Sequence, residues 1–254
     1  MRENGEMGVD GFELNSKYKF DYTKGLYYQI WNTSWTFDEY VQYINEPKHL
    51  VNPIRDIKLF DNFFLEFFTK GPWYFVLGVY GPQIFYFLMT STGCLFNIFV
   101  YTMIGLLAWT LGEYLIHRFL FHSEDYWLPS HPKILANHFL IHGIHHAFPQ
   151  DRLRLTFPVV PGQIILGACF MLPARTCLPV EMQNPFIAGA YLGYLIYDMV
   201  HYFVHFGNPR PGHWMDMKKY HMQHHYKNGT MGFGVSQKFW DRIFSTEIID
   251  YSKT

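Results

Sequence analysis

The sequence predicts an all-α integral membrane protein with about four transmembrane helices, arranged as two hairpins under a helical cytosolic cap. Three observations predict this fold class. Only 16% of the 254 residues are charged, whereas about 25% is usual in soluble domains, and aromatic residues reach 20%. Four long apolar segments follow one another along the middle of the chain. Histidine is frequent, and every one of its 14 residues except His49 follows position 116.

The composition also argues against several classes of protein. Lys and Arg number 20 against 21 Asp and Glu, so no basic field is available to attract nucleic acid. The three cysteines, Cys94, Cys169 and Cys177, form no CxxC spacing and no disulfide framework. Because they lie in apolar stretches, we expect them to be buried. The first thirty residues contain no apolar core of a signal peptide, so no cleaved leader is expected.

The chain is predicted to divide into an N-terminal cytosolic or interfacial segment, residues 1–70, and a membrane domain, residues 71–254. Near the end of the first part, LFDNFFLEFFT (59–69) has the composition of a short aromatic helix. Such a helix could lie in the membrane interface or pack under the cytosolic part of the protein. We see no internal repeat of 20–50 residues.

The first pair of apolar segments covers about residues 73–89 and 94–116. A transmembrane helix needs about 20 residues, so the second segment is long enough and the first is marginal. The second carries a single carboxylate, Glu113, which is costly inside an apolar helix unless it is paired or functional. These two segments are predicted to form the first hairpin.

The second pair covers about residues 157–173 and 185–206 and is less uniformly apolar. The first of them contains prolines, and the second carries Asp198, His201 and His205 in its later half. Short spans and a re-entrant hairpin are both compatible with this pattern. Buried helices of a soluble protein are the alternative for all four segments.

The distribution of positive charge gives the orientation. If all four segments cross, residues 1–72, 117–156 and 207–254 share one side and hold 19 of the 20 Lys and Arg. Only Arg175 falls on the other side. Positive residues collect on the cytoplasmic side of membrane proteins, so the shared side is predicted to be cytosolic.

Histidines form four clusters with regular spacing. Residues three and four apart are neighbours on one helix face, so we expect the imidazoles of each HxxHH motif to point into the same space. The five-residue spacing of the first cluster suits a helix end or a distorted turn. The clusters are His117 and His122 in HRFLFH, His142, His145 and His146 in HGIHH, His201 and His205 in HYFVH, and His221, His224 and His225 in HMQHH.

All four clusters lie at or beyond the predicted cytosolic ends of the spans, so the ten imidazoles can converge near the bilayer boundary. Ten imidazoles brought together cannot all be protonated, and metal binding resolves this conflict. Eight or more ligands imply two ions. No cysteine lies nearby and no Glu-x-x-His bundle pattern is present, so an all-histidine dimetal site is predicted.

These phrases resemble the fatty acid hydroxylase and sterol desaturase superfamily, and within it most closely the fatty acid 2-hydroxylases of sphingolipid metabolism. The resemblance runs from about Glu46 to Thr246. Its most specific part is YHMQHHYKN followed by GFGV and WDRIF, within 218–246. The other phrases are FLEFFTKGPWY (64–74), GEYLIHRFLFH (112–122), HFLIHGIHHAFPQDRLRLTFP (138–158) and YDMVHYFVHFG (197–207).

The resemblance implies a membrane monooxygenase. It implies that the ten clustered histidines ligate two iron ions that use O2, with zinc at the site in isolated protein. It implies 2-hydroxylation of the long acyl chain of a ceramide-like sphingolipid or its fatty acyl precursor, in the endoplasmic reticulum membrane with the site facing the cytosol. Many members carry a fused cytochrome b5 domain with a His-Pro-Gly-Gly motif, which is absent here. A separate cytochrome b5 or another membrane reductase is therefore expected to supply electrons.

Other polar residues are candidates for roles beside the ligands. Asp198, three residues before His201, and Glu113, four before His117, could accept hydrogen bonds from ligating imidazoles. Tyr197 is a candidate for the substrate path, and Asp198 and Tyr197 are the predicted catalytic residues. His138, one turn before His142, is a candidate hydrogen-bond partner of a ligand.

Several other functions are considered. A sterol methyl oxidase, a sphingoid C4-hydroxylase and a desaturase share the dimetal chemistry, but the GFGV and WDRIF phrases favour the 2-hydroxylase. A metal transporter needs polar residues near the membrane midplane, whereas these clusters lie at one end of the spans. A structural zinc protein is the remaining alternative. The pattern gives no oligomeric state.

Overall fold

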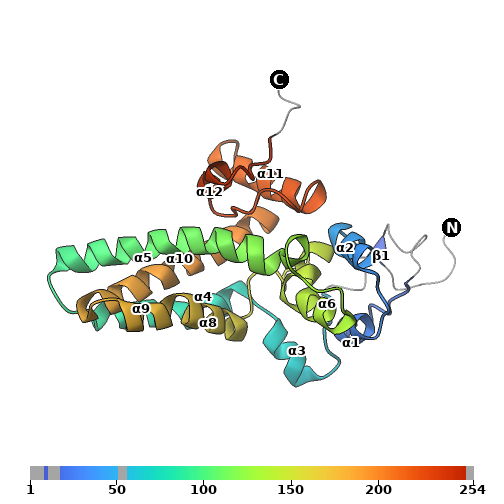
Figure 1. Ribbon diagram of the computed structural model, residues 1–254, viewed down its shortest axis with the longest axis horizontal. Helices are drawn as coiled ribbons and strands as arrows, with labels where there is room; N and C mark the ends of the chain where they lie inside the picture. Colours follow the sequence, from blue (N-terminus) through green and yellow to red (C-terminus); the bar gives the residue numbers. More distant parts are fainter. Residues whose placement is uncertain (1–8, 11–17, 51–55, 250–254) are drawn as a thin grey trace.

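Helices build nearly all of this computed structural model, which describes residues 9–10, 18–50 and 56–249 (Figure 1). Within these residues, strand structure is confined to β1 (Val9–Asp10) and β2 (His49–Leu50), paired antiparallel with Val9 opposite Leu50. The prediction of an all-α fold is therefore confirmed. Parts of the predicted N-terminal segment, residues 1–8, 11–17 and 51–55, lie outside the described residues.

A bundle of long helices forms the elongated half of the molecule (Figure 1). Its first two members are α4 (Trp73–Met89) and α5 (Leu95–Ile116), close to the apolar ranges of the sequence. The third member is one helical run made of α8 (Val159–Leu166), the π-helical η4 (Gly167–Met171) and α9 (Leu172–Cys177). The fourth, α10 (Val180–Phe206), begins five residues earlier than expected, directly after Pro179, so Pro185 lies inside the helix.

Glycines bring the backbones of α5 and α10 close together. A Cβ atom on Gly105 would lie 2.0 Å from the Phe186 carbonyl oxygen, and one on Gly189 would lie 1.9 Å from that of Thr102. Only glycine fits at both positions, and small residues of this kind are typical of helix contacts in membranes. The α5–α10 pair therefore forms the centre of the bundle.

The bundle turns apolar surface outward. Two helical runs, Leu95–Phe121 and Val159–Cys177, are long and apolar enough to cross a membrane, and only 11% and 22% of their most apolar stretches are buried. A core helix of a soluble protein would be mostly buried instead. The expectation that the cysteines are buried was wrong, because Cys94, Cys169 and Cys177 lie on this outward-facing surface and are exposed.

A second hydrophobic core lies at the other end of the molecule. It joins α1 (Leu26–Trp31) and α2 (Phe37–Asn45) to α6 (Pro132–His138) and α7 (Ile144–Ala147). Thr36 and Glu39 cap the start of α2 reciprocally, which fixes where this helix begins. We call this part the cap.

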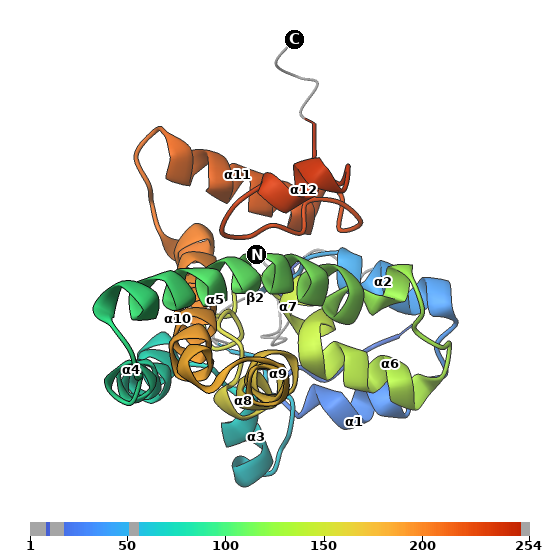
Figure 2. The same cartoon turned by 60° about the vertical axis from the view of Figure 1, so that its left-hand side comes forward.

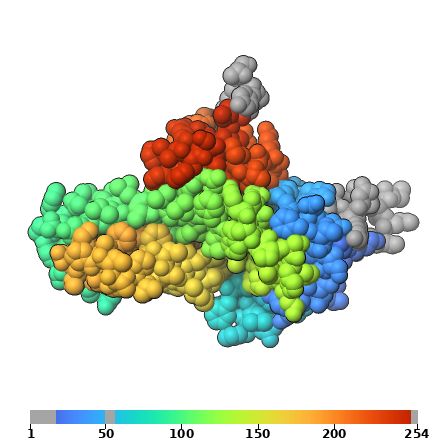
Figure 3. All heavy atoms as spheres, in the orientation of Figure 1, coloured from blue at the N-terminus to red at the C-terminus, as the bar shows by residue number. Residues whose placement is uncertain are grey.

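Three further helices flank the junction between bundle and cap. Helix α3 (Phe63–Thr69) projects on one side, and α11 (His213–Tyr226) and α12 (Phe239–Ile243) cover the opposite side (Figures 1 and 2). The space-filling view shows α3 standing out from the lower edge and the C-terminal helices from the upper edge (Figure 3). The clustered histidines lie at this junction.

Candidate metal centre

Two π-helical turns carry the first histidines. In η1 (His117–Phe121), the His122 N–H donates to the His117 carbonyl oxygen five residues back, at 3.0 Å. This wider turn brings both imidazoles to the same side, with ring centroids 5.0 Å apart. The distorted turn predicted from the five-residue spacing is therefore this π turn. A second π turn, η3 (Phe139–Gly143), carries His142, and η2 (Ser123–Asp125) is a short 3₁₀ turn.

The first histidine group gathers imidazoles from elements far apart in the sequence. Each contributes a ring nitrogen, and these nitrogens all lie within 4.8 Å of one another. All five side chains are buried. The group comprises His117, His122, His142, His146 and His224.

The second histidine group is built in the same way from α7, α10 and α11. Its five ring nitrogens also lie within 4.8 Å of one another and are buried. The two groups adjoin, because the rings of His146 and His225 are centred 4.4 Å apart. The second group comprises His145, His201, His205, His221 and His225.

Each HxxHH motif divides its imidazoles between the two groups, which corrects the expectation that all three share one space. In HGIHH, His142 and His146 join the first group and His145 joins the second. HMQHH has the reverse arrangement, with His224 alone in the first group. Helical residues advance by about 100°, so positions three and four after a residue lie on either side of it, about 100° apart. Adjacent histidines therefore face different groups.

Hydrogen bonds fix the orientation of the first group. His117 and His224 donate from Nδ1 to the carbonyl oxygens of Phe233 and Met231, at 2.6 and 2.7 Å. A carbonyl oxygen only accepts, so Nδ1 carries the proton in both rings and Nε2 keeps its lone pair. Such outer hydrogen bonds are typical of metal-ligating histidines.

The loop that supplies these carbonyl groups is held by two carboxylates. Glu113 accepts hydrogen bonds from the backbone N–H groups of Val235 and Ser236, at 3.1 and 2.9 Å. Asp241 accepts from the N–H of Gly234, at 2.8 Å. Gly232 has φ +78°, a left-handed conformation that favours glycine. The expectation that Glu113 bonds an imidazole needs correction, because its hydrogen bonds position the loop behind His117 instead.

Burial keeps these imidazoles neutral. It lowers the pKa of His142, His145 and His146 well below 6.5, and neighbouring imidazoles lower it further. Burial likewise lowers the pKa of His224 to about 3. Neutral rings offer lone pairs to a cation, which is the state that metal binding requires.

The donor sets fit two metal ions. Both ring nitrogens of His145 and of His146 find no hydrogen-bond partner among the described residues, although buried polar atoms normally have one. His205 Nε2 and His221 Nε2 lie 2.9 Å apart, and His122 Nε2 and His224 Nε2 lie 3.1 Å apart. Two nitrogens that bond one ion at about 2.1 Å each are separated by about 3.0–3.4 Å for angles of about 90–109° at the ion, so these pairs are already near the spacing of shared ligands. Imidazole sets of this kind suit Zn, Cu, Fe and Ni.

A buried carboxylate that the sequence reasoning missed connects the first group to the cap. Glu124 accepts a hydrogen bond from His122 Nδ1 at 3.0 Å, and its other oxygen lies 2.7 Å from His138 Nε2. Tyr40 donates its hydroxyl to His138 Nδ1 at 2.6 Å. Although burial raises the pKa of Glu124, the two histidines lower it below the usual range. His138 therefore does have the indirect contact with a ligand that its spacing indicated.

A model of the fatty acid hydroxylase family matches residues 102–246, which is more than half of the chain. The chain belongs to this family. It is 38% identical over 93% of its length to "Ceramide very long chain fatty acid hydroxylase scs7" of Schizosaccharomyces pombe. It is 34% identical over 91% of its length to "Dihydroceramide fatty acyl 2-hydroxylase FAH2" of Arabidopsis thaliana.

A solved structure described as full-length scs7p, with only the hydroxylase domain visible, has the same fold. Its TM-score is 0.83 at 38% identity, covering 91% of this chain and 86% of that one. The chain spans 67% and 59% of the length of two fungal relatives and 64% of a rat relative. It spans 94% of the Arabidopsis relative.

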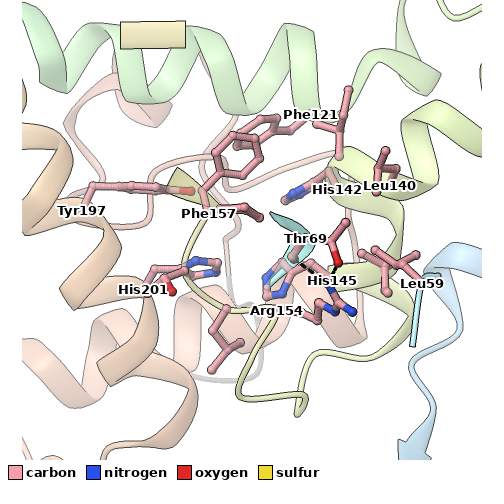
Figure 4. Close-up of a pocket in the computed structure, with 15 residues that line it drawn as sticks. Leu59, Thr69, Phe121, Leu140, His142, His145, Arg154, Phe157, Tyr197 and His201 are labelled. Atoms are coloured by element: carbon pink, nitrogen blue, oxygen red, sulfur yellow. Dashed lines mark hydrogen bonds between the residues drawn. The ribbon is translucent and has the colours of Figure 1, made fainter. Parts of the chain in front are cut away.

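In this hydroxylase, a pocket opens beside both histidine groups (Figure 4). His142 of the first group and His145 and His201 of the second line it. Tyr197 stacks on His201, with centroids 5.7 Å apart, and lines the same pocket. Asp198 accepts a hydrogen bond from the Phe157 N–H at 3.1 Å and none from an imidazole among the described residues, so the expectation that it bonds a ligating histidine needs correction.

A second, apolar pocket of the hydroxylase lies on the bundle side, between α5, α8 and α10. Phe121, Phe157 and Tyr197 line both pockets and therefore form a partition between them. Trp109 and Ile165 line only the bundle side. An apolar chain coming from the bundle would meet these aromatic rings first.

The remaining histidines lie away from both groups. His131 and His213 are exposed, and His49 is exposed and stacks near Tyr226 at 6.3 Å. They belong to neither group.

Proposed function

We propose that the chain is an O2-dependent fatty acid 2-hydroxylase. Its substrate is the long acyl chain of a ceramide-like sphingolipid or the fatty acyl precursor, and the product carries a hydroxyl group on carbon 2. One observation carries the proposal: two adjoining groups of five buried imidazoles each, next to an aromatic pocket. Relatives named as ceramide and dihydroceramide hydroxylases support the substrate class.

Each histidine group is assigned one metal ion, so that all ten predicted histidines act as ligands. When bound, a pair of iron ions would supply the redox chemistry that activates O2, the oxidant, for hydroxylation of a C–H bond. Zinc suits the same imidazoles and can occupy them in isolated protein. Electrons are assigned to a separate cytochrome b5 or membrane reductase.

The residues of the chain hold the ligating histidines in place, shield the site from water and orient the acyl chain. Hydrogen bonds from His117 and His224 to backbone carbonyl groups keep their Nε2 atoms directed inward. The rings of Phe121 and Phe157 exclude water and guide the acyl chain towards the histidines. Tyr197 is assigned to the substrate path, and Asp198 to positioning the Phe157 backbone.

The proposed arrangement is a multi-pass protein of the endoplasmic reticulum membrane. Four spans, α4, α5, the α8–α9 run and α10, would form two hairpins, with residues 1–70 and the cap in the cytosol. The supporting observation is that this orientation leaves 19 of the 20 Lys and Arg on the cytosolic side.

The test expresses the chain with a cytochrome b5 and compares it with H224A/H225A, which removes one ligand from each group. Mass spectrometry follows 2-hydroxylated ceramides, and elemental analysis follows metal content. The matched control is H213A, an exposed histidine on the same helix. We expect product and about two ions per chain with the intact protein and H213A, and loss of both with the double variant. Unchanged metal content in the double variant would contradict the ligand assignment.

A further inference from the structure

Helix α3 has its polar and apolar sides reversed relative to a helix on a soluble protein. Phe63 is 84% exposed, and Phe64, Phe67 and Phe68 are also exposed, whereas Glu66 is only 8% exposed. The carboxylate of Glu66 faces the protein, where Arg154 donates to it at 2.6 Å and the backbone N–H groups of Leu59 and Phe60 donate at 2.9 Å. We call the four phenylalanines the α3 patch.

Helix α12, on the opposite side of the molecule, likewise buries its carboxylate and exposes apolar residues, while its one exposed charge, Arg242, pairs with Glu247 at 3.0 Å. Its carboxylate, Asp241, is fully buried and accepts hydrogen bonds from Phe233, Gly234 and Thr246. Phe239 and Ile243 are each 57% exposed, and the adjoining Phe244 is exposed as well. We call Phe239, Ile243 and Phe244 the α12 patch.

This reversal indicates an apolar medium outside both helices. A surface helix in water turns its charged residues outward and its apolar residues towards the core. Contiguous aromatic patches on a soluble monomer mark a binding surface. Aromatic residues are enriched where a protein meets the membrane–water interface.

The α3 patch is continuous with the bundle. Phe67 contacts Phe75, the third residue of α4, with ring centroids 6.4 Å apart. Arg154 donates to the Thr69 carbonyl and to Glu66, so α3 is fastened to the segment that precedes α8. The patch is therefore held rigidly at the start of the proposed first span.

The α12 patch lies at the same end of the bundle. Trp240 donates its indole N–H to the Thr110 hydroxyl at 3.1 Å, and Phe244 stacks on Tyr114 at 5.1 Å. Tyr114 is the third residue from the end of α5, and α5 follows α4 in the opposite direction (Figure 1). Phe75 and Tyr114 therefore both lie towards the end of the bundle that meets the cap, with α3 and α12 on opposite sides of the molecule (Figures 1 and 3).

We propose that the α3 patch and the α12 patch are both immersed in the lipid headgroup and upper acyl region of one leaflet, and that together they fix the depth of the histidine groups. The lipid bilayer itself covers both patches, because each patch continues the outward-facing apolar surface of the bundle. Amphipathic helices of this kind insert by burying their apolar face at the headgroup boundary.

The fixed depth has a consequence for the site of reaction. His117 lies seven residues beyond Thr110, which is roughly 10 Å along the helix towards the cytosol. The histidine groups then face the headgroup end of a lipid, where carbon 2 adjoins the acyl carbonyl. This consequence, unlike the immersion itself, rests on the proposed 2-hydroxylase function.

The test uses the full chain in phosphatidylcholine nanodiscs, with C94S, C169S and C177S in the background. One nitroxide label is attached at a time, through F64C, F67C, F239C or I243C. Collisions of the label with O2, which concentrates in lipid, are compared with collisions with chromium oxalate, which stays in water. References of similar exposure are F99C on α5 for lipid and Y28C on α1 for water.

We expect the four patch positions to give O2-to-oxalate collision ratios several-fold above that of Y28C and at or below that of F99C. Ratios equal to that of Y28C, with F99C in lipid, would overturn the proposal. A water-like F99C would overturn the proposed spans and the immersion together. Wild-type metal content in each labelled protein establishes that it is folded. If the labels are immersed but the protein makes no 2-hydroxylated lipid, the proposal that both patches lie in the membrane is supported. The proposed 2-hydroxylase function is then rejected.

Discussion

At the scale of single residues, Glu124 is a carboxylate in direct contact with the first histidine group. It contacts His122 and His138, and His138 in turn contacts Tyr40. Replacing it by alanine leaves the His122 Nδ1–H without an acceptor in a buried site. Loss of such an outer hydrogen bond costs about 10–100-fold in metal affinity. We expect E124A to lose metal to a chelator at a correspondingly lower concentration, as measured by elemental analysis after dialysis.

Two comparisons separate this effect from general damage. E124Q keeps an oxygen that can accept from His122, so it should retain more metal than E124A. D216N changes an exposed carboxylate on α11 that belongs to neither histidine group and should match the wild-type protein. Equal metal retention by E124A and D216N would show that Glu124 does not support His122.

The buried histidines also predict a pH dependence for the metal-free protein. Burial lowers the pKa of His142, His145 and His146 in the folded state, whereas unfolded histidines titrate near 6.5. Below pH 6.5 the unfolded chain therefore binds more protons, so the free energy of unfolding falls as the pH falls. We expect the thermal midpoint of chelator-treated protein to drop between pH 7.5 and 5.5, with a shallower drop for H224A/H225A. A pH-independent midpoint would contradict this expectation.

The ten clustered histidines could be predicted from the sequence because helical spacing places such residues on shared faces. Their division into two groups of five could not, since it depends on how α7, α10 and α11 are rotated against one another. Glu124 lies only two residues from His122, and a search for carboxylates beside each histidine would have found it. Tyr40 is 98 residues from its partner His138, and no local pattern connects them.

At the scale of elements, the π turn η1 sets the direction of His122. Deleting Leu120, an inner residue of this turn, would restore four-residue hydrogen bonding and rotate His122 relative to His117. Because the two groups share helices, we expect this deletion to lower the metal content of both groups, as measured by elemental analysis. Deleting Cys169 from the π turn η4, far along the bundle, should leave metal content unchanged. Full metal content after the Leu120 deletion would show that the turn is dispensable.

The attachment of α3 gives a second prediction for an element. Arg154 and Glu66 form a buried ion pair at 2.6 Å, and removing one partner of such a pair costs about 3–5 kcal/mol. R154M should therefore lower the thermal midpoint clearly. R154M/E66L should recover only part of the loss, because the Leu59 and Phe60 N–H groups then lose their acceptor. The exposed pair of Arg242 and Glu247 is the control, because R242M should change stability by less than about 1 kcal/mol. An equal effect of R154M and R242M would contradict this account.

The bounds of the helices were predictable where composition changes abruptly. α4 and α5 nearly coincide with the apolar ranges, because polar or glycine residues end each of them. The start of α10 could not be found in this way, since Pro185 resembles a helix start and is tolerated inside this helix. The π turns η3 and η4 were also hidden, because one extra residue in a turn leaves no mark in composition, whereas the spacing of His117 and His122 did indicate a distorted turn at η1.

At the scale of the whole molecule, each histidine group joins elements that are far apart in the sequence. Metal binding to the folded state alone stabilises it by about 2.7 kcal/mol at a free concentration one hundred times the dissociation constant. We expect chelation to lower the thermal midpoint and zinc to restore it. The thermal midpoint of H224A/H225A should change little in either treatment. If the midpoint of the wild-type protein does not change when chelator is added, bound metal does not stabilise the fold.

The division of each HxxHH motif between the two groups couples the binding of one ion to the binding of the other. His145 and His146 are neighbours in one short helix, and His224 and His225 in another, yet each pair serves both groups. Under the proposed assignment, the first ion to bind orders both helices and so prepares the partners of the second. Loading should then be cooperative, and half-loaded chains should be scarce. In a cell with limited iron, the population would divide into molecules that hold two ions and molecules that hold none.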